Sequence, residues 1–590
     1  MMIDLNRIHG IKESVEEKLN RIYGSEKGPK ITERVIRLME KYKDVKGPTK
    51  QWVDQQDVML ITYGDSIREQ GKAPLQTLHG FLKEYASDIL NAVHILPFYP
   101  YSSDDGFSVI DYTQVNSELG DWGDIQRFSA DFDLMFDGVI NHISQQSEWF
   151  QRYRKGDPEF SSFFIEADPD EDYSMVTRPR ARPLLTPFDT KQGRKYLWTT
   201  FSEDQIDLNY QNEHVFLAVL EVLLFYVKQG MRFLRLDAVG YLWKEWGSPC
   251  IHLPQTHLLV QVIREILETV APGTIIITET NVPHQENIRY FGNGHNEAHM
   301  IYQFPLPPLT LYTFHKGDAK HLSSWAASLE PTTDDTTYFN FLASHDGIGV
   351  RPVESILTEE EVREMADKVR EHGGFVSYKD NGDGTQSPYE LNINYLDALS
   401  HPDDPVDLKV KRFMAAQAIL LSVVGVPGVY IHSLLGSRND LKGVEKSGRF
   451  RSINREKLDR KELERELRDE TSLRHQVFVR YKELLNIRRR EKAFHPNAMQ
   501  NVLFLDDRVF SIVRTSTDRS EQILVCINVA NQPISIRIPD LPAEYEWKNL
   551  FTGEPVSTRY GNREVSLAPY QVLWIKGKRI GYGSHSWPSL

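Results

Sequence analysis

Short apolar segments alternate with longer helical segments eight times along this chain, and this alternation constrains the fold more than any other feature. Each short segment is rich in Val, Ile, Leu and aromatic residues, which is typical of a strand buried on both faces. Eight alternations predict an α/β fold, a (β/α)8 TIM barrel in which helices surround parallel strands. The predicted strands are 57–64, 92–99, 133–141, 231–238, 274–280, 299–306, 336–344 and 426–433.

An open, doubly wound sheet is the alternative that the same alternation allows. Such a sheet would carry a Gly-rich phosphate-binding turn after its first strand. The corresponding segment here, ITYGDSI (61–67), is not a turn of that kind. The closed barrel is therefore favoured.

Two strand-to-helix connections in the predicted barrel are far longer than usual. They cover residues 142–210, after the third strand, and 347–410, after the seventh. Connections of this length are normally functional lids or inserted subdomains. In a barrel, both would emerge at the carboxyl ends of the strands, the face on which catalytic residues lie.

At 590 residues, the chain is too long for a single core and is predicted to contain more than one domain. We expect a helical extension at 1–52, the barrel with its insertions at 53–500, an antiparallel β-domain at 501–580 and a loose tail at 581–590. Apolar residues at three- and four-residue intervals identify the extension, and short strands without long helices identify the β-domain.

Charge and composition argue against several classes of function. The formal net charge of −14 argues against general binding to nucleic acid or to a membrane surface. The N-terminus has no apolar signal core, and no segment approaches the length of a transmembrane helix. Two distant cysteines, Cys250 and Cys526, have no metal-ligand spacing. Together these features predict a reduced, cytoplasmic location.

Two acidic residues stand where predicted strands end. Asp237 ends strand 231–238, and Glu279 ends strand 274–280. Catalytic groups of a barrel come from the carboxyl ends of neighbouring strands. Two carboxylates about 5 Å apart can act as nucleophile and acid/base in a retaining reaction at a glycosidic bond. A lone acidic residue at such a place is more often a helix N-cap, so the prediction depends on further residues at the same face.

Four blocks of sequence supply such residues and carry a resemblance to a known family. In chain order, on the third, fourth, fifth and seventh strands, they are DGVINH (137–142), RLDAVG (235–240), TETN (278–281) and ASHDGIG (343–349). They resemble the four recurrent motifs of the α-amylase family of glycoside-processing enzymes. Further segments resemble the sucrose phosphorylase-like branch of that family: SSDDGFSVIDY (102–112), TRPRARPLLTPF (177–188), KEWGSPCIHL (244–253), FPLPPL (304–309) and INREK (453–457).

The resemblance implies roles for three carboxyl groups. Asp237 is similar to the nucleophile that forms a covalent glucosyl ester, and Glu279 is similar to the general acid/base, whose pKa must be raised for that role. Asp346 is similar to a third carboxylate that binds sugar hydroxyls and stabilises positive charge at the anomeric carbon. Arg235, two residues before Asp237, would keep that carboxylate ionised by charge pairing.

The resemblance also implies a pocket for a single glucose unit. His142 and His345 are similar to residues that hold glucose hydroxyls, and Phe107 is similar to an apolar wall of the pocket. Asp104 and Arg451 are similar to groups that close off the far end of the glucose ring. A pocket closed in this way would be one sugar deep, whereas an amylase that cleaves glucan chains would have an open groove.

Arginines in the first insertion predict that an anion takes part in the reaction. Arg178, Arg180 and Arg182 lie within five residues, in a loop stiffened by two prolines. A guanidinium group binds phosphate or carboxylate in a two-pronged geometry. In the sucrose phosphorylase branch, the arginine that matches Arg180 helps to bind phosphate, and the tyrosine that matches Tyr389 lies in the opposing loop.

The activity implied by the resemblance is phosphorolysis of an α-glucoside to α-glucose 1-phosphate through a covalent intermediate. The segments 177–188 and 377–392 and the helical extension are more similar to enzymes that act on a glucoside of glycerate than to those that act on sucrose. Sucrose, sucrose 6′-phosphate and glucosylglycerol are the alternative substrates. A retaining α-glucosidase and a non-catalytic relative are the alternative classes.

The ligands expected on this basis are a sugar, phosphate and glycerate, with no cofactor, and a homodimer is also considered. No metal is expected either. The run DNGDGT (380–385) is predicted to be a polar turn, because Gly382 stands where an EF-hand loop needs an oxygen ligand.

Overall fold

A closed barrel of eight parallel strands forms the centre of the molecule. The computed structural model describes residues 5–179, 182–381, 384–539, 541–556 and 564–580, so the predicted tail lies outside the described residues. In their order around the barrel the strands are β1 (Met59–Thr62), β16 (Val426–Tyr430), β12 (Thr337–Phe341), β11 (Met300–Tyr302), β10 (Ile275–Thr278), β9 (Met231–Leu236), β4 (Asp133–Gly138) and β3 (Ala92–Ile95). Each lies within a predicted strand, and the predicted fold class is confirmed.

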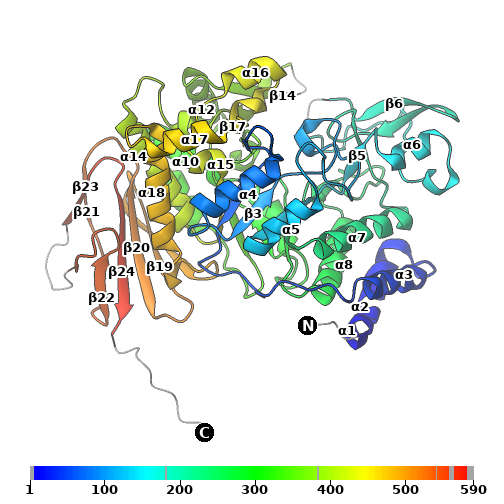
Figure 1. The fold of residues 1–590 in the computed structure, drawn as a ribbon, viewed down its shortest axis with the longest axis horizontal. Helices are drawn as coiled ribbons and strands as arrows, with labels where there is room; N and C mark the ends of the chain where they lie inside the picture. The colour runs from blue at the N-terminus through cyan, green and yellow to red at the C-terminus, as the bar shows by residue number, and fades with distance from the viewer. Residues whose placement is uncertain (1–4, 180–181, 382–383, 540, 557–563, 581–590) are drawn as a thin grey trace, which may run out of the picture.

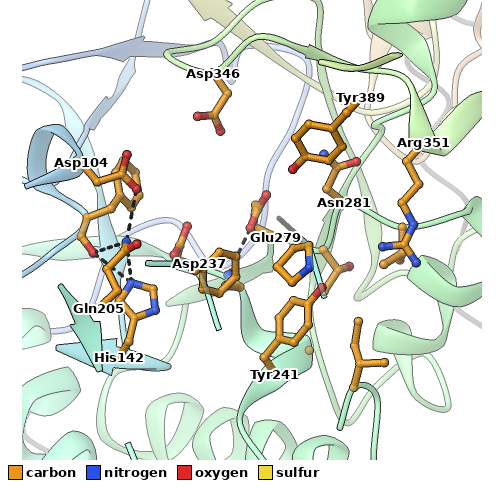
Figure 2. Close-up of a pocket in the computed structure, with 18 of the residues that line it drawn as sticks. Asp104, His142, Gln205, Asp237, Tyr241, Glu279, Asn281, Asp346, Arg351 and Tyr389 are labelled. Carbon is orange, nitrogen blue, oxygen red and sulfur yellow. Dashed lines mark hydrogen bonds between the residues drawn. The ribbon is translucent and has the colours of Figure 1, made fainter. Parts of the chain in front are cut away.

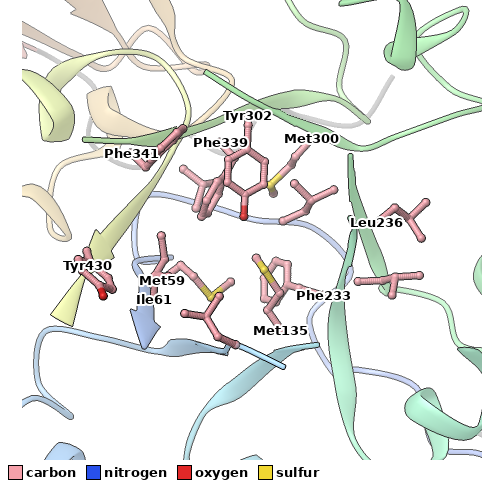
Figure 3. Close-up of a cluster of buried hydrophobic side chains, with 14 of the residues drawn as sticks. Met59, Ile61, Met135, Phe233, Leu236, Met300, Tyr302, Phe339, Phe341 and Tyr430 are labelled. Carbon is pink, nitrogen blue, oxygen red and sulfur yellow. The ribbon is translucent and has the colours of Figure 1, made fainter. Parts of the chain in front are cut away.

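The barrel is filled by side chains of its own strands. Nearly every residue of the eight strands is buried, as expected when one face of a strand points into the barrel and the other lies under helices. Figure 3 shows Met59, Met135, Phe233, Met300 and Phe339 gathered in this interior, each almost fully buried. The barrel is therefore a packed core, and chemistry is confined to its carboxyl end.

Helices cover the outside of the barrel. They are α4 (Pro74–Tyr85), α5 (Trp122–Asp131), α7 (Glu213–Lys228), α8 (Pro254–Val270), α10 (Leu306–Lys316), α14 (Val406–Ser422) and α18 (Leu473–Arg488). α8 shows how local sequence sets the bounds: it begins at Pro254, a favoured first helical residue, and ends before Gly273. Gly273 has a φ of 92°, and a Cβ there would lie 2.7 Å from the Lys50 carbonyl oxygen, so only glycine fits.

Two insertions emerge after the third and seventh barrel strands, as predicted. The first carries β5 (His142–Ser144), α6 (Glu148–Arg154), β6 (Leu185–Thr190), β7 (Gly193–Trp198) and β8 (Gln205–Asp207). The second carries β13 (Ile348–Gly349), α12 (Glu359–Glu371), β14 (Phe375–Asp380), β15 (Gln386–Asn392) and α13 (Tyr395–Leu399). Both have small antiparallel sheets of their own, so each is a folded subdomain. These sheets hold in place the loops that face the carboxyl end of the barrel.

The N-terminal segment folds into three helices, α1 (Leu5–Gly10), α2 (Lys12–Tyr23) and α3 (Gly28–Lys41), on one flank of the barrel (Figure 1). α2 packs against α8, and α3 packs against α7. The apolar face of α2 is buried at Val15 and Leu19, and the Lys18 ammonium pairs with Glu265 at 2.9 Å. These helices therefore pack on the layer of helices that surrounds the barrel.

The C-terminal residues form an antiparallel sheet on the opposite flank (Figure 1). Its order is β18 (Met499–Asp506), β19 (Val509–Thr515), β20 (Glu521–Asn528), β24 (Val572–Arg579) and β22 (Tyr545–Asn549), and β21 (Ile534–Arg537) pairs separately with β23 (Glu564–Leu567). The short strands expected from the sequence between 501 and 580 did not include β22 and β23. In β22, YEWKN, only Tyr545 and Trp547 are buried, so the apolar signal is too short to stand out.

Candidate active site

The three predicted carboxylates lie around one pocket at the carboxyl end of the barrel. Asp237 directly follows β9, Glu279 directly follows β10, and Asp346 lies between β12 and β13. All three side chains line the same cavity, as Figure 2 shows. The barrel thus brings together acidic residues that are far apart in the sequence.

One guanidinium group contacts two of the carboxylates. Arg235 Nη1 lies 2.8 Å from Asp237 Oδ1, and Arg235 Nη2 lies 3.9 Å from Glu279 Oε2. Arg235 is held in turn by an ion pair with the fully buried Asp137 and by a hydrogen bond from its Nε to the Tyr302 hydroxyl, 3.1 Å away. Because Arg235, Asp137 and Tyr302 belong to barrel strands, the two catalytic-site carboxylates are fixed next to each other.

The two carboxyl groups differ in how strongly they hold a proton. Burial is the largest influence on Glu279; Arg235 opposes it and the charges of Asp237 and Asp346 add to it, so the pKa of Glu279 rises to about 7. Burial also raises the pKa of Asp237, although Arg235 and His142 oppose it. The expected pairing of Asp237 with Arg235 is present, but burial outweighs its effect on the pKa. Since Arg235 lies nearer to Asp237, a proton shared by the pair resides on Glu279.

Asp346 is an anion held mainly by arginine side chains. Its Oδ1 lies 2.6 Å from Arg451 Nη1, and its Oδ2 lies 3.5 Å from His345 Nε2. Burial alone would raise the pKa of Asp346, but Arg451, His345 and Arg455 more than offset burial and hold that pKa well below its usual range. Arg451 is itself clamped by Glu390 through two contacts of 2.7 and 3.1 Å.

The glucose-binding residues suggested by the resemblance lie at one end of the pocket. Gln205 Nε2 donates to Asp104 Oδ2 at 3.2 Å and also lies 3.2 Å from His142 Nε2. The Phe107 ring stacks on His345 with centroids 4.9 Å apart. Asp104 has a φ of 55°, in the left-handed region that non-glycine residues rarely occupy, so its backbone is strained at the pocket wall.

The other end of the pocket is lined by a different set of side chains. They are Tyr241, His252, Asn281, Arg351 and Tyr389. In Figure 2, Asp104 and His142 lie on one side of Asp237 and Glu279, and Arg351 lies on the other. The pocket therefore has two chemically distinct ends with the carboxyl pair between them.

The arginine-rich loop of the first insertion reaches this region in part. Pro179 lines the pocket, but Arg180 lies outside the described residues. Arg182 is exposed and lines a neighbouring cavity, which also contains Lys379 and Arg449. Tyr389, from β15 of the second insertion, lines both cavities.

Several residues of the site were not singled out from the sequence. Asp137 belongs to the quoted block 137–142, and its place in the middle of an apolar strand was the signal that could have found it. Gln205, Arg351 and Glu390 come from the two insertions. No periodic pattern marks these three, because irregular connections position them.

A buried ammonium group lies beside the site. Lys244 Nζ donates a hydrogen bond to Asn141 Oδ1 at 3.0 Å and forms an ion pair with Asp207 Oδ2 at 2.6 Å. Within the part of the chain that the structure describes, no cluster of three or more His, Cys, Asp or Glu side chains could hold a metal ion. Over the same residues, no helix has both the length and the apolar character needed to cross a membrane.

Comparison with known proteins identifies the class to which this barrel and its carboxylates belong. Residues 81–369 match the alpha amylase catalytic domain, and residues 501–574 match the maltogenic amylase C-terminal domain. The chain belongs to the α-amylase family, and its relatives of known activity cover nearly its whole length.

Those relatives include two glucosylglycerate phosphorylases. The one from Spirochaeta thermophila is 47% identical, with 95% of this chain and 98% of the relative covered, and the one from Escherichia coli is 46% identical, with 96% and 100% covered. Among solved structures, sucrose 6F-phosphate phosphorylase from Thermoanaerobacter thermosaccharolyticum is similar with a TM-score of 0.71 and 26% identity, covering 86% of this chain and 98% of that one.

Proposed function

We propose that this chain is a glucosylglycerate phosphorylase, which converts 2-O-α-D-glucosylglycerate and phosphate into α-D-glucose 1-phosphate and glycerate with retention at the anomeric carbon. The observation that carries the proposal is the Arg235 guanidinium, which lies 2.8 Å from Asp237 and 3.9 Å from Glu279 and so holds the two carboxyl groups side by side. The raised pKa of Glu279 suits it to the role of the acid. A nucleophile and an acid held side by side are what the first step of a retaining reaction requires.

In the first step, an Asp237 oxygen attacks the anomeric carbon and forms a glucosyl ester. The bond from that carbon to the glycerate oxygen breaks, and Glu279 gives its proton to this leaving oxygen. Asp346 is a further anion at the site and would stabilise the positive charge that develops on the sugar. The products of this step are glycerate, with its hydroxyl group protonated, and the covalent glucosyl-enzyme.

In the second step, a phosphate oxygen attacks the same carbon and displaces Asp237. Glu279, now ionised, accepts the proton of the incoming phosphate and returns to its starting state. Two inversions give α-glucose 1-phosphate with the configuration of the starting glucoside. Reversal of both steps, with glycerate as acceptor, synthesises the glucoside.

Phosphate must intercept the covalent intermediate before water does. We propose that the arginine-rich loop, with Arg180 as its phosphate-binding member and Arg182 as a further candidate, raises the local occupancy of phosphate. The neighbouring Pro179, which lines the pocket, supports this role for the loop. We also propose a cytoplasmic location, which two free, buried cysteines support. The homodimer remains a prediction.

The test of this proposal is an assay in the synthetic direction. Purified protein receives α-glucose 1-phosphate with glycerate, fructose, fructose 6-phosphate or glycerol in parallel, and phosphate release is measured. Glycerate should give the highest kcat/KM. A higher value with fructose, fructose 6-phosphate or glycerol would instead assign the alternative substrate, and equal release without any acceptor would identify a hydrolase.

A further inference from the structure

The end of the pocket that faces away from the glucose-binding residues contains an arginine side chain, Arg351. Arg351 begins the turn after β13, at the start of the second insertion, and its partly exposed side chain lines the pocket. The Val350 N–H donates to the Tyr389 carbonyl oxygen at 3.2 Å, which ties this turn to β15. Arg351 is thus presented by a braced segment of backbone.

The surroundings of Arg351 are aromatic and polar, without an anion. Its charge acts on the Tyr241 hydroxyl and on the His252 ring, which line the same pocket. Across the described residues, no carboxylate lies within 4 Å of Arg351. Asn281, on the same wall, has a buried Oδ1 with no hydrogen-bond partner among the described residues.

The other cations near the carboxyl pair are already neutralised. Arg451 pairs with Asp346 and Glu390, and Arg455 pairs with Asp105. Arg235 pairs with Asp137 and Asp237, inside the barrel. Each of these arginines has a fixed anionic partner, so none offers an open charge to a ligand. Lys379, in the neighbouring cavity, is also occupied, by Glu354 at 2.6 Å.

We infer that Arg351 binds the anionic group of the acceptor: the carboxylate of glycerate in the synthetic direction and phosphate in phosphorolysis. This inference rests on the proposed function, since it concerns the acceptor of that reaction. A carboxylate and a phosphate both present oxygen pairs that a guanidinium group can bind with two hydrogen bonds. The Asn281 amide can donate a hydrogen bond to the same anion, and its Oδ1 can accept one from a neighbouring hydroxyl.

α-Glucosyl fluoride makes the test specific, because this donor carries no anionic group that remains in the acceptor site. Wild type, Arg351→Gln and Arg351→Lys each receive the donor with phosphate, with glycerate, or with neither. In Arg351→Gln, KM for phosphate and KM for glycerate should both rise at least about 30-fold. KM for the donor should change less than about threefold, and Arg351→Lys should recover part of the loss.

Lys379→Gln is the matched control, since it removes one positive charge from the same insertion but from a paired side chain. All three KM values should stay close to those of wild type in this variant. Thermal unfolding midpoints of the variants show whether each one is folded.

The outcomes separate this inference from the proposed function. If wild type uses phosphate and glycerate but Arg351→Gln shows unchanged acceptor KM values, or equal increases for donor and acceptor, Arg351 is not the anion site although the function stands. If wild type uses phosphate but not glycerate, the substrate assignment is wrong, and the phosphate arm still tests Arg351. If phosphate does not change the rate at which wild type consumes the donor, the proposed phosphorylase function and the inference on Arg351 are both wrong.

Discussion

The backbone N–H of Ala238 donates a hydrogen bond to Glu279 Oε2 across 3.1 Å. Ala238 directly follows Asp237 and has a φ of 50°, in the left-handed region, so the chain turns sharply just after the nucleophile proposed here. This turn directs the Ala238 N–H toward the end of the neighbouring strand, β10. The same short segment therefore positions both members of the carboxyl pair.

Replacing Glu279 with Gln keeps an acceptor for the Ala238 N–H but removes the proton that the leaving group needs. Phosphorolysis of the glucoside should fall by about 10²–10⁴-fold. Reaction of α-glucosyl fluoride with the enzyme should fall much less, because fluoride leaves without protonation. Azide, a nucleophile that needs no base, should then restore turnover of the fluoride. Equal losses with both donors and no effect of azide would rule out the acid/base role.

The pKa of about 7 at Glu279 sets the pH dependence of the first step. Glu279 acts there in its protonated form, so kcat/KM for the glucoside should be at its plateau well below pH 7 and fall about tenfold per pH unit well above it. With α-glucosyl fluoride this alkaline fall should vanish. A pH profile of kcat/KM for the two donors checks this, and the same alkaline fall for both would mean that another group titrates.

Glu390 is expected to act in the reaction only through Arg451, which it holds in position. Its carboxylate holds the guanidinium by two contacts, and a Cβ at Gly347 would lie 2.5 Å from Glu390 Cγ, so the backbone is shaped around this side chain. Glu390→Gln should raise KM for the glucosyl donor about tenfold, which corresponds to one lost charged hydrogen bond. Glu354→Gln, which breaks the more exposed pair with Lys379, is the control and should change KM little. Steady-state kinetics with α-glucosyl fluoride distinguish the two; matching effects would contradict the positioning role.

The N-terminal helices should be stabilised mainly by the packing of α2 on α8. Leu19 of α2 is fully buried, so Leu19→Ala should lower the local stability of α2 by about 2–5 kcal/mol. Glu17, on the exposed face of α2, offers a control whose replacement by Ala should cost less than about 0.5 kcal/mol. Native-state hydrogen exchange at the amides of α2 measures both. Unchanged exchange in Leu19→Ala would show that the extension is held by other contacts.

The sequence was sufficient to predict the barrel because each strand carries its own signal. Segments such as 231–238 and 274–280 are rich in apolar residues, so they could be predicted as buried strands. Asp237 and Glu279 could be placed on one face because the carboxyl ends of parallel strands share an edge. Asp346 was identified by the resemblance of its block, 343–349, to a motif of the α-amylase family.

The acceptor end of the site could not be predicted, for a physical reason. Tyr241 and His252 come from the connection between β9 and α8, and Arg351 comes from the second insertion. These connections have no periodicity, and the positions of the three residues depend on how the two connections pack against each other. The role of the arginine-rich loop stays a prediction, since Arg182 lines the neighbouring cavity and Arg180 lies outside the described residues. An unpaired charge becomes visible only when the partners of all nearby charges are known.

Mass spectrometry of a trapped intermediate tests the central claim most directly. Glu279→Gln is incubated with α-glucosyl fluoride in the absence of phosphate and glycerate, quenched in acid and digested. The account predicts that the peptide containing Asp237 gains the mass of one anhydroglucose unit, and that this gain disappears when azide is added before the quench. A peptide that stays unmodified while the donor is consumed, or a glucosyl group attached to a different residue, would contradict it.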